Sequence, residues 1–378
     1  MKRSILLCNI FVVFIINFAV SHAKPAADSI PFKFLEHRIL VKGNINKSQN
    51  DYNFIIDTGG LTFIDKNIVQ ELTLKQHGMM AKIDTLHLSG FQIENIFCFT
   101  TFDFQHLKKL GIPIHGIIGS NLLERFKVTF DFKSCIVTIS GDTTNIEPDE
   151  NGLFLSFRNH PVNNAPLVKF TLNQKIMEGM IDTGHPYPLV LPLNTFEQHK
   201  NINISDSIKS KGLIAKWPMT SADHNYLTRL KRFELGNIKI ENTICLFGEL
   251  PPVLSIPLIG MDFLSQFEIT INYPKDEMMM IPYHDIHFKN NLFSLGLDVN
   301  LSEKNEIIVE GLWENSPADK ANIQVGDIII AFNSQKTTHE NLMDLRKIMK
   351  DNNIESINLE VKNQKGRRKI KLNKAMLF

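Results

Sequence analysis

The sequence predicts a mostly β protein with two homologous lobes, followed by a third domain of mixed α+β structure. Three observations favour this fold class. An apolar-apolar-Asp-Thr-Gly pattern occurs twice, at residues 55–59 and 180–184. Most segments around the two copies are short runs rich in Ile, Val, Phe and Thr that end at Gly, Asn, Asp or Pro, which is typical of β-strands. After Met280 the pattern changes, and a separate domain is predicted to follow.

The first segment, residues 1–23, is predicted to be a secretory signal peptide. Lys2 and Arg3 precede an apolar run at residues 5–20, and a short segment with small residues ends at Ala23. The run is shorter than the about 20 residues that span a bilayer. We expect cleavage after Ala23, with an uncleaved N-terminal anchor as the alternative. The mature chain is then expected to be exported, to the periplasm or the extracellular space, without an integral membrane span.

The composition indicates a folded globular protein that does not bind nucleic acid. At 378 residues with 43% apolar residues, the chain is long enough for two or three domains whose cores need no disulfide or metal. A formal net charge of +1 provides no basic surface for nucleic acid. The basic cluster at residues 365–369 is interpreted as a solvated hairpin between two strands.

The cysteines are predicted to be buried free thiols. Export permits disulfides, but cleavage after Ala23 leaves the odd set Cys98, Cys135 and Cys245 in largely apolar surroundings. The sequence contains no C-x-x-C or H-E-x-x-H motif, so neither a metal nor a cofactor is predicted.

Two further segments repeat in the same order as the Asp-Thr-Gly pattern. Ile-Glu-Asn-x-x-Cys occurs at residues 93–98 and 240–245. An apolar pair before Gly119, a short helical turn and an alternating strand are repeated around Gly260. Three ordered matches indicate two homologous lobes with loops of different length. The lobes are predicted at residues 24–150 and 151–285, with insertions in the second copy chiefly at residues 191–229 and short helices at residues 65–72 and 121–125.

The duplicated Asp-Thr-Gly, each followed by apolar-apolar-Gly and a short helix, resembles the pepsin and retropepsin superfamily of aspartic proteases. The first lobe is the closer match, with 62 residues from Asp57 to Gly119 against 78 from Asp182 to Gly260. The resemblance covers about residues 28–283. It implies a bilobal acid protease fold that needs no cofactor.

This resemblance implies that Asp57 and Asp182 meet at the lobe interface as a catalytic pair. Hydrolysis of a peptide bond needs a charged carboxylate that activates water and a protonated carboxyl that polarises the amide. Two like charges held together separate their proton affinities, so the pair titrates as a unit. The residues expected to support the pair are Thr58, Gly59, Thr183, Gly184, Gly119 and Gly260. For Gly119 and Gly260, a purely structural role is the alternative.

Two features depart from the family or lack a clear counterpart in it. His185 follows the second Asp-Thr-Gly where a small residue is usual, and it is expected either to charge near neutral pH beside Asp182 or to point outward. A hairpin at residues 75–84, with two methionines, is a candidate substrate-covering flap or an ordinary strand. Trp217 is the corresponding candidate in the second lobe.

The last domain, residues 286–378, resembles a bacterial PDZ domain. Ser-Pro-Ala at residues 316–318 and Val-Gly-Asp-Ile-Ile at residues 325–329 carry most of the match, with a predicted helix at residues 339–351. Such a domain binds peptide termini or strands by adding them to a sheet edge. By the resemblance, Leu295, Gly296 and Leu297 form the carboxylate-binding loop, although the family's loop is commonly richer in glycine than this one. A scaffold with an empty groove is the alternative.

Together these features predict an exported aspartic endopeptidase that acts on protein or peptide substrates, as a monomer. The PDZ-like domain would bind substrate or regulatory peptides. One alternative is a catalytically inactive peptide-binding protein that retains the protease fold. Another is a self-cleaving or narrowly specific processing protease.

Overall fold

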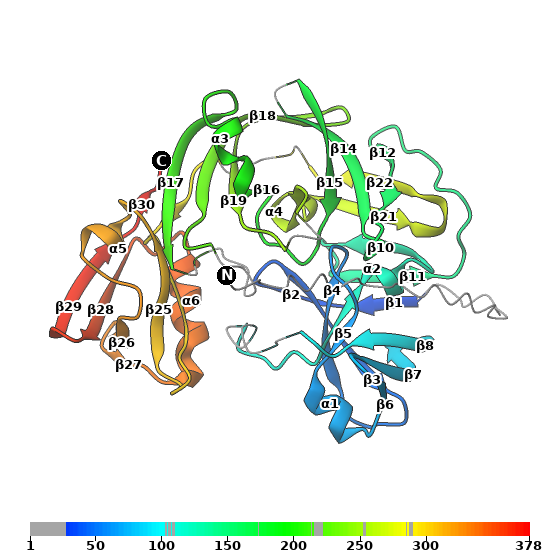
Figure 1. Ribbon diagram of the computed structural model, residues 1–378, viewed down its shortest axis with the longest axis horizontal. Coiled ribbons are helices and arrows are strands. Elements are labelled where there is room, and N and C mark those ends of the chain that lie inside the picture. The colour runs from blue at the N-terminus through cyan, green and yellow to red at the C-terminus, as the bar shows by residue number, and fades with distance from the viewer. Residues whose placement is uncertain are drawn as a thin grey trace, which may run out of the picture.

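The computed structural model describes residues 28–378, except 103, 105–106, 108–109, 173, 213, 215–221, 252–254, 285 and 287–289. The predicted signal peptide and Trp217 therefore lie outside the described residues. The protein is mostly β, as expected. In Figure 1 the first half of the chain (blue and cyan) lies below the second (green and yellow), and the C-terminal domain (orange and red) lies to one side.

The first half forms an eight-stranded sheet that presents Asp57 at the end of a central strand. Its spatial order is β2-β3-β4-β9-β5-β8-β7-β6. The strands are β2 (Lys33–Leu35), β3 (Arg38–Ile45), β4 (Tyr52–Asp57), β5 (Phe63–Ile64), β6 (Lys75–His77), β7 (Met80–Leu88), β8 (Phe91–Phe99) and β9 (Gly116–Gly119). Strand β4 pairs in parallel with β9, so that Asp57 lies opposite Gly119.

The second half repeats this arrangement. Its strands follow the order β13-β14-β15-β20-β16-β19-β18-β17, and each occupies the place of its counterpart in the first sheet. Both halves also share an additional pairing, β3 with β7 and β14 with β18. The strands are β13 (Arg158–Asn159), β14 (Pro166–Leu172), β15 (Lys175–Ile181), β16 (Leu189–Pro192), β17 (Ile204–Gly212), β18 (Tyr226–Leu235), β19 (Ile238–Gly248) and β20 (Leu258–Ile259). The sequence repeat is therefore also a repeat of strand order.

A third sheet joins the two halves. Its order is β1-β11-β10-β21-β22-β12, with three strands from each half. The strands are β1 (Asp28–Pro31), β10 (Lys127–Asp131), β11 (Ile136–Ser140), β12 (Leu153–Ser156), β21 (Phe267–Asn272) and β22 (Glu277–Pro282). At its centre β10 pairs with β21, and the Oγ1 atoms of Thr129 and Thr270 lie 2.9 Å apart. One hydrophobic core runs through both halves, so they form a single packed unit.

Short helices interrupt the sheets, and some of them lie where the sequence predicts helical turns. Helix α1 (Lys66–Glu71) begins after Asp65, whose side chain accepts a hydrogen bond from Asn67 N and satisfies a free amide of the first turn. This confirms the helix predicted at residues 65–72. The remaining helical segments of the two halves are α2 (Ser120–Leu123), η2 (Leu193–Thr195), α3 (Phe196–His199), α4 (Met261–Leu264) and η4 (Tyr273–Lys275).

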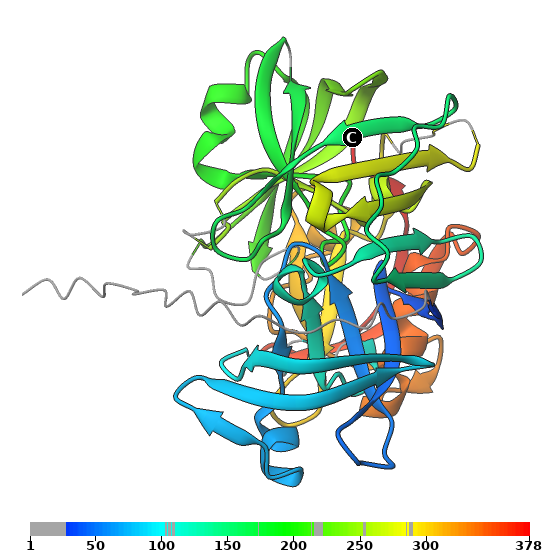
Figure 2. The same ribbon diagram turned by 90° about the vertical axis from the view of Figure 1, so that its right-hand side faces the viewer.

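The C-terminal domain has its own core, built on side chains such as Val299, Leu345 and Leu359. Its strands are β23 (Phe293–Ser294), β24 (Leu297–Leu301), β25 (Ile307–Trp313), β26 (Ile328–Phe332), β27 (Gln335–Lys336), β28 (Ser356–Asn363), β29 (Gly366–Asn373) and β30 (Ala375–Met376). Its helical segments are α5 (Pro317–Lys320), η5 (His339–Asn341) and α6 (Leu342–Lys350). Figure 2 gives a second view of how this domain lies against the rest of the molecule.

The C-terminal domain is attached to the second half by a shared sheet edge. The end of β17 pairs antiparallel with β25, from Ser210 opposite Trp313 to Gly212 opposite Gly311. Lys211 Nζ also lies 2.8 Å from Asp319 Oδ1 at the start of α5. These contacts fix the position of the domain against the second half.

Among the described residues, Cys98, Cys135 and Cys245 are free, and Cys98 and Cys245 are buried. Cys135 is only half buried, so the prediction of burial is wrong for it, because it occupies a turn between β10 and β11. Within the residues that the structure describes, no helix has the length and apolar character needed to cross a membrane.

Candidate active site

The two Asp-Thr-Gly loops lie against each other at the interface of the halves. Thr58 N donates to Thr183 Oγ1 (3.0 Å), and Thr183 N donates to Thr58 Oγ1 (3.1 Å). Each hydroxyl then donates to a carbonyl of the opposite strand, Thr58 to Ile181 O (2.7 Å) and Thr183 to Ile56 O (3.0 Å). Both threonines are buried. Four reciprocal hydrogen bonds therefore hold the loops in a nearly symmetric arrangement.

Asp57 and Asp182 face each other across this interface. Their carboxyl groups hydrogen-bond to each other, and each also accepts a backbone amide of its own loop. Gly59 N donates to Asp57 Oδ1 (2.9 Å), and Gly184 N donates to Asp182 Oδ1 (2.8 Å). The loops thus orient both carboxyl groups in the same way.

The two glycines leave space for the opposite carboxyl group. A Cβ added to Gly59 would lie 2.4 Å from Asp182 Cγ, and one added to Gly184 would lie 2.4 Å from Asp57 Oδ2. Real Cβ atoms do not approach other atoms so closely. A side chain at either position would therefore push the two carboxyl groups apart.

Burial and proximity give the two carboxyl groups different proton affinities. Burial raises the pKa of Asp57, while the Gly59 amide and the nearby charge of Arg38 oppose this rise. Burial raises the pKa of Asp182 further, because the charge of Asp57 acts in the same direction. The two carboxyl groups therefore titrate as a coupled pair, and the proton affinity of Asp182 is the higher of the two.

Gly119 and Gly260 support the loops from behind. A Cβ on Gly119 would lie 2.3 Å from the carbonyl carbon of Leu61, and one on Gly260 would lie 2.3 Å from Tyr187 O. Both glycines therefore pack against the backbone that follows each Asp-Thr-Gly. Their close contacts are with backbone, which gives them a structural role.

A cavity of about 550 Å³ opens in front of Asp57. All three parts of the chain line it, including Arg38 of the first half, His185 of the second half, and Leu295 and Arg346 of the C-terminal domain. Its size falls within the range of sites that hold small molecules or peptide side chains.

The candidate flap of the first half is a hairpin between β6 and β7. Met79 at its tip is exposed, and Met80 pairs with Phe99 on β8. Neither methionine lines the cavity in front of Asp57. In this structure the C-terminal domain, and not this hairpin, contributes to the wall of the cavity.

Both expectations for His185, a charge near neutral pH and an outward-pointing side chain, are wrong. Its side chain is buried, so it does not point outward. Burial, with Arg38 nearby, lowers its pKa to about 3, so the imidazole stays neutral near neutral pH. Its Nδ1 accepts a hydrogen bond from Tyr187 N (3.3 Å), which stabilises the turn after the second loop.

Arg38, at the start of β3, is a residue of the site that sequence reasoning missed. Its Nη1 donates to Glu36 O (3.0 Å), and its charge interacts favourably with Asp57 and Asp182. Burial lowers the pKa of Arg38, but a guanidinium remains charged in proteins. No local pattern marks Arg38, because its partners Asp57 and Asp182 are distant from it in the sequence.

The loop predicted to bind a carboxylate is present, but it is partly occupied. Gly296 has a φ of 78°, and a Cβ there would lie 2.0 Å from Ser316 Cβ, so only glycine fits. Its amide donates to Ser294 Oγ (2.9 Å), and the side chains of Leu295 and Leu297 are buried. The Ser294 hydroxyl therefore uses one of the amides expected to bind a terminal carboxylate.

Comparison with known proteins identifies a PDZ domain within the C-terminal domain. The family model for PDZ domains matches residues 308–363, from β25 to the end of β28. A comparison with curated proteins finds no match for the chain. A PDZ domain suggests that peptides are partners of this protein.

Proposed function

We propose that this protein is an aspartic endopeptidase in which residues 28–283 adopt a bilobal acid protease fold. Asp57 and Asp182 form the catalytic pair, and no cofactor is required. The observation that supports this most strongly is the pairing of two carboxyl groups with different proton affinities at the end of duplicated strands. The resemblance of both Asp-Thr-Gly segments to aspartic proteases points the same way.

In the proposed reaction, ionised Asp57 removes a proton from a water molecule placed between the two carboxyl groups. The oxygen of that water attacks the peptide carbonyl, while protonated Asp182 donates its proton to the carbonyl oxygen. The resulting gem-diol collapses as Asp57 passes the proton to the departing nitrogen, and a diol proton returns to Asp182. The C–N bond breaks, and the pair regains its starting protonation. Arg38 favours the ionised state of Asp57 throughout.

Peptides are the substrates that the rest of the molecule supports. A PDZ domain suggests peptide binding, and the cavity in front of Asp57 is lined in part by the C-terminal domain that contains the PDZ domain. We further propose that the protein is exported, on the pattern of residues 1–23.

A non-catalytic peptide-binding protein is the second candidate. The observation that favours it is the cover over Asp57, since residues of the C-terminal domain form part of the cavity wall. A covered site suits a binding protein as well as a protease whose cover must move.

Digestion of a proteome-derived peptide library, from pH 3 to 8, separates these functions. The chain without residues 1–23 is compared with Asp57→Asn, Asp182→Asn and the exposed control Asp84→Asn. New peptide termini with the wild type and Asp84→Asn, but with neither of the other variants, are expected. Intact-mass measurement of the stored protein detects self-cleavage. Equal cleavage by Asp57→Asn would rule out the proposed mechanism, and no cleavage by the wild type at any pH would favour the binding protein.

A further inference from the structure

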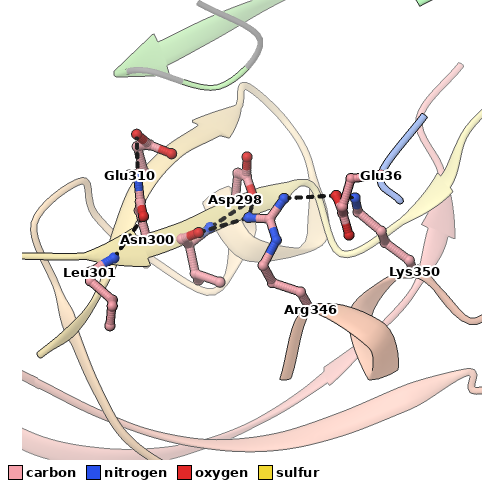
Figure 3. Close-up of polar contacts among 8 residues, drawn as sticks. Glu36, Asp298, Asn300, Leu301, Glu310, Arg346 and Lys350 are labelled. Carbon is pink, nitrogen blue, oxygen red and sulfur yellow. Dashed lines mark hydrogen bonds and ion pairs between the residues drawn. The ribbon is translucent and has the colours of Figure 1, made fainter. Parts of the chain in front are cut away.

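Residues of β24 and α6 line one side of the cavity in front of Asp57, a part called the PDZ groove below, and one arginine connects the two elements. Arg346 of α6 is almost fully buried. Its Nη1 donates to Asp298 Oδ1 (2.6 Å) and to Val299 O (2.8 Å), both on β24 (Figure 3). The guanidinium thus connects the helix to the strand at which a peptide is expected to add.

Side chains of the domain occupy the free edge of β24. Among the described residues, β24 pairs with β25 alone, so its other edge is open to a further strand. Val299 N donates to Asp298 Oδ1 (2.9 Å), and Leu301 N donates to Asn300 Oδ1 (2.9 Å). With Val299 O bound to Arg346, three backbone groups that would pair with a peptide already have partners.

A glutamate from the first half of the chain holds Arg346 in place. Glu36 Oε2 accepts from Arg346 Nη2 (3.2 Å) and also contacts Lys350 Nζ (Figure 3). The Glu36 side chain is only 12% exposed. Arginine and lysine with a shared carboxylate form a strong, directional contact when solvent is largely excluded.

The turn that carries Glu36 is strained. Glu36 and His37 connect β2 to β3, with φ values of 51° and 60°. Two-residue hairpin turns of this type favour Asn and Gly, because other residues are strained in the left-handed region. Such strain persists where surrounding contacts enforce it, and it is concentrated at sites of binding and switching. The contacts of Glu36 with the PDZ domain, and of His37 Nδ1 with Asp262 Oδ1 (2.9 Å), are suited to enforce it.

Arg346 also keeps capacity for another acceptor. Its Nε is buried without a hydrogen-bond partner among the described residues. Arg346, Lys350 and Glu36 all line the same cavity as Asp57. A buried donor that lacks a partner is costly, so a ligand that supplies an acceptor is favoured there.

We propose that Arg346 and Lys350 form a carboxylate-binding site in the PDZ groove, that Glu36 occupies this site as an internal ligand, and that a peptide carboxylate replaces Glu36. The carboxylate is either an acidic side chain or a free C-terminus, which share the same chemistry. When the peptide carboxylate replaces Glu36, the Arg346 guanidinium turns toward it and leaves Val299 O to pair with the peptide backbone.

Replacement also loosens the wall of the cavity in front of Asp57, because Glu36 bridges the first half and the PDZ domain there. Peptide binding would thereby increase access to the catalytic pair. This consequence rests on the proposed protease function, whereas the binding site itself does not.

Fluorescence anisotropy with three labelled peptides tests the site. The peptides share one apolar sequence. The first carries a glutamate near an amidated C-terminus, the second a free C-terminus without acidic side chains, and the third neither. All measurements use the full chain in an Asp182→Asn background, so that turnover does not consume the probes. Binding is then measured independently of proteolysis, and failure of the proposed function leaves the result intact.

Glu36→Gln should raise the affinity for a carboxylate-bearing peptide by at least about tenfold, because an internal ligand leaves only about a tenth or less of the sites open. Glu303→Gln, an exposed matched control, should leave the affinity unchanged. Adding Lys350→Gln to Glu36→Gln should remove part of the gain. Thermal melting checks that each variant folds, and Glu36→Asp, which shortens the side chain, should give a smaller gain if Glu36→Gln does not fold.

The relative response of the first two peptides identifies the source of the carboxylate. Equal affinity of wild type and Glu36→Gln for both would overturn the proposal. So would binding of the uncharged, amidated peptide to Glu36→Gln as tightly as the other two, or the absence of binding in every variant.

Discussion

Replacement of Thr58 by Val should lower the free energy of unfolding, because it removes a hydroxyl that makes two of the four hydrogen bonds between the Asp-Thr-Gly loops. Val has nearly the same shape, so the loss is one of hydrogen bonding rather than of packing. Thr183 N and Ile181 O would lose their partner inside the protein. Each buried group left unpaired costs about 1–3 kcal/mol, so the expected loss is about 2–6 kcal/mol. This is a large part of the total stability of a typical domain, about 5–15 kcal/mol.

Urea unfolding followed by far-ultraviolet circular dichroism measures this loss. Thr171→Val on β14 is the matched control, and it should change the free energy of unfolding by less than about 1 kcal/mol. Thr183→Val should cost about as much as Thr58→Val, because the arrangement is nearly symmetric. The double variant should cost less than the sum of the two, because the two threonines share hydrogen bonds. A loss below about 1 kcal/mol for Thr58→Val would refute the view that these bonds hold the loops together.

Three further predictions follow from the carboxyl pair, His185 and Gly296. The rate of cleavage should have a bell-shaped pH dependence, because activity is lost at low pH when Asp57 takes up a proton and at high pH when Asp182 loses its proton. His185→Gln should leave both limbs of this profile unchanged between pH 4 and 8, because burial lowers the pKa of His185 to about 3. A shifted limb would contradict the neutrality of His185. Burial raises the folded-state pKa of Asp182, so the contribution of this group to the free energy of unfolding should be largest below its unfolded pKa of about 4 and should be lost as pH rises through the folded value. Urea unfolding of the Asp182→Asn variant should lack this contribution, and a pH dependence identical to that of the wild type would contradict the assignment. Gly296→Ala should cost about 2–5 kcal/mol in thermal unfolding, because a Cβ meets Ser316 and the backbone is left-handed. Gly326→Ala, also left-handed but in open space, should cost only about 1–2 kcal/mol, and equal costs would contradict the predicted clash.

The duplicated strand order follows motifs that are visible in the sequence. Asp-Thr-Gly and apolar-apolar-Gly recur in order because the crossing of two strands behind a tight turn leaves no room for a Cβ at Gly119 or Gly260. Helix α1 was predictable for a similar local reason, since Asp65 satisfies its first turn. Features with a local physical cause leave a local pattern.

The contacts around the cavity have no such pattern. Glu36 meets Arg346 across a separation of 310 residues, and neither residue lies in a motif. The expectation for His185 was wrong for the same reason, because its burial depends on packing that the local sequence does not display. Arg38 acquires its role only when folding brings β3 beside Asp57 and the second half brings Asp182 near. Long-range packing therefore decides the electrostatics of the site, and the sequence alone does not reveal it.

The two halves are similar but not identical, so the two sides of the Asp-Thr-Gly pair differ. If the halves were identical, a peptide could lie across the loops in either sense, because its two ends would meet the same walls. Here Gly60 follows the first loop and His185 follows the second, and among the described residues the outer strand of the second half, but not of the first, pairs with the C-terminal domain. A peptide bound across the loops, as proposed, would therefore meet different surroundings on its amino and carboxyl sides. The broken symmetry provides a physical basis for reading a peptide in a single orientation.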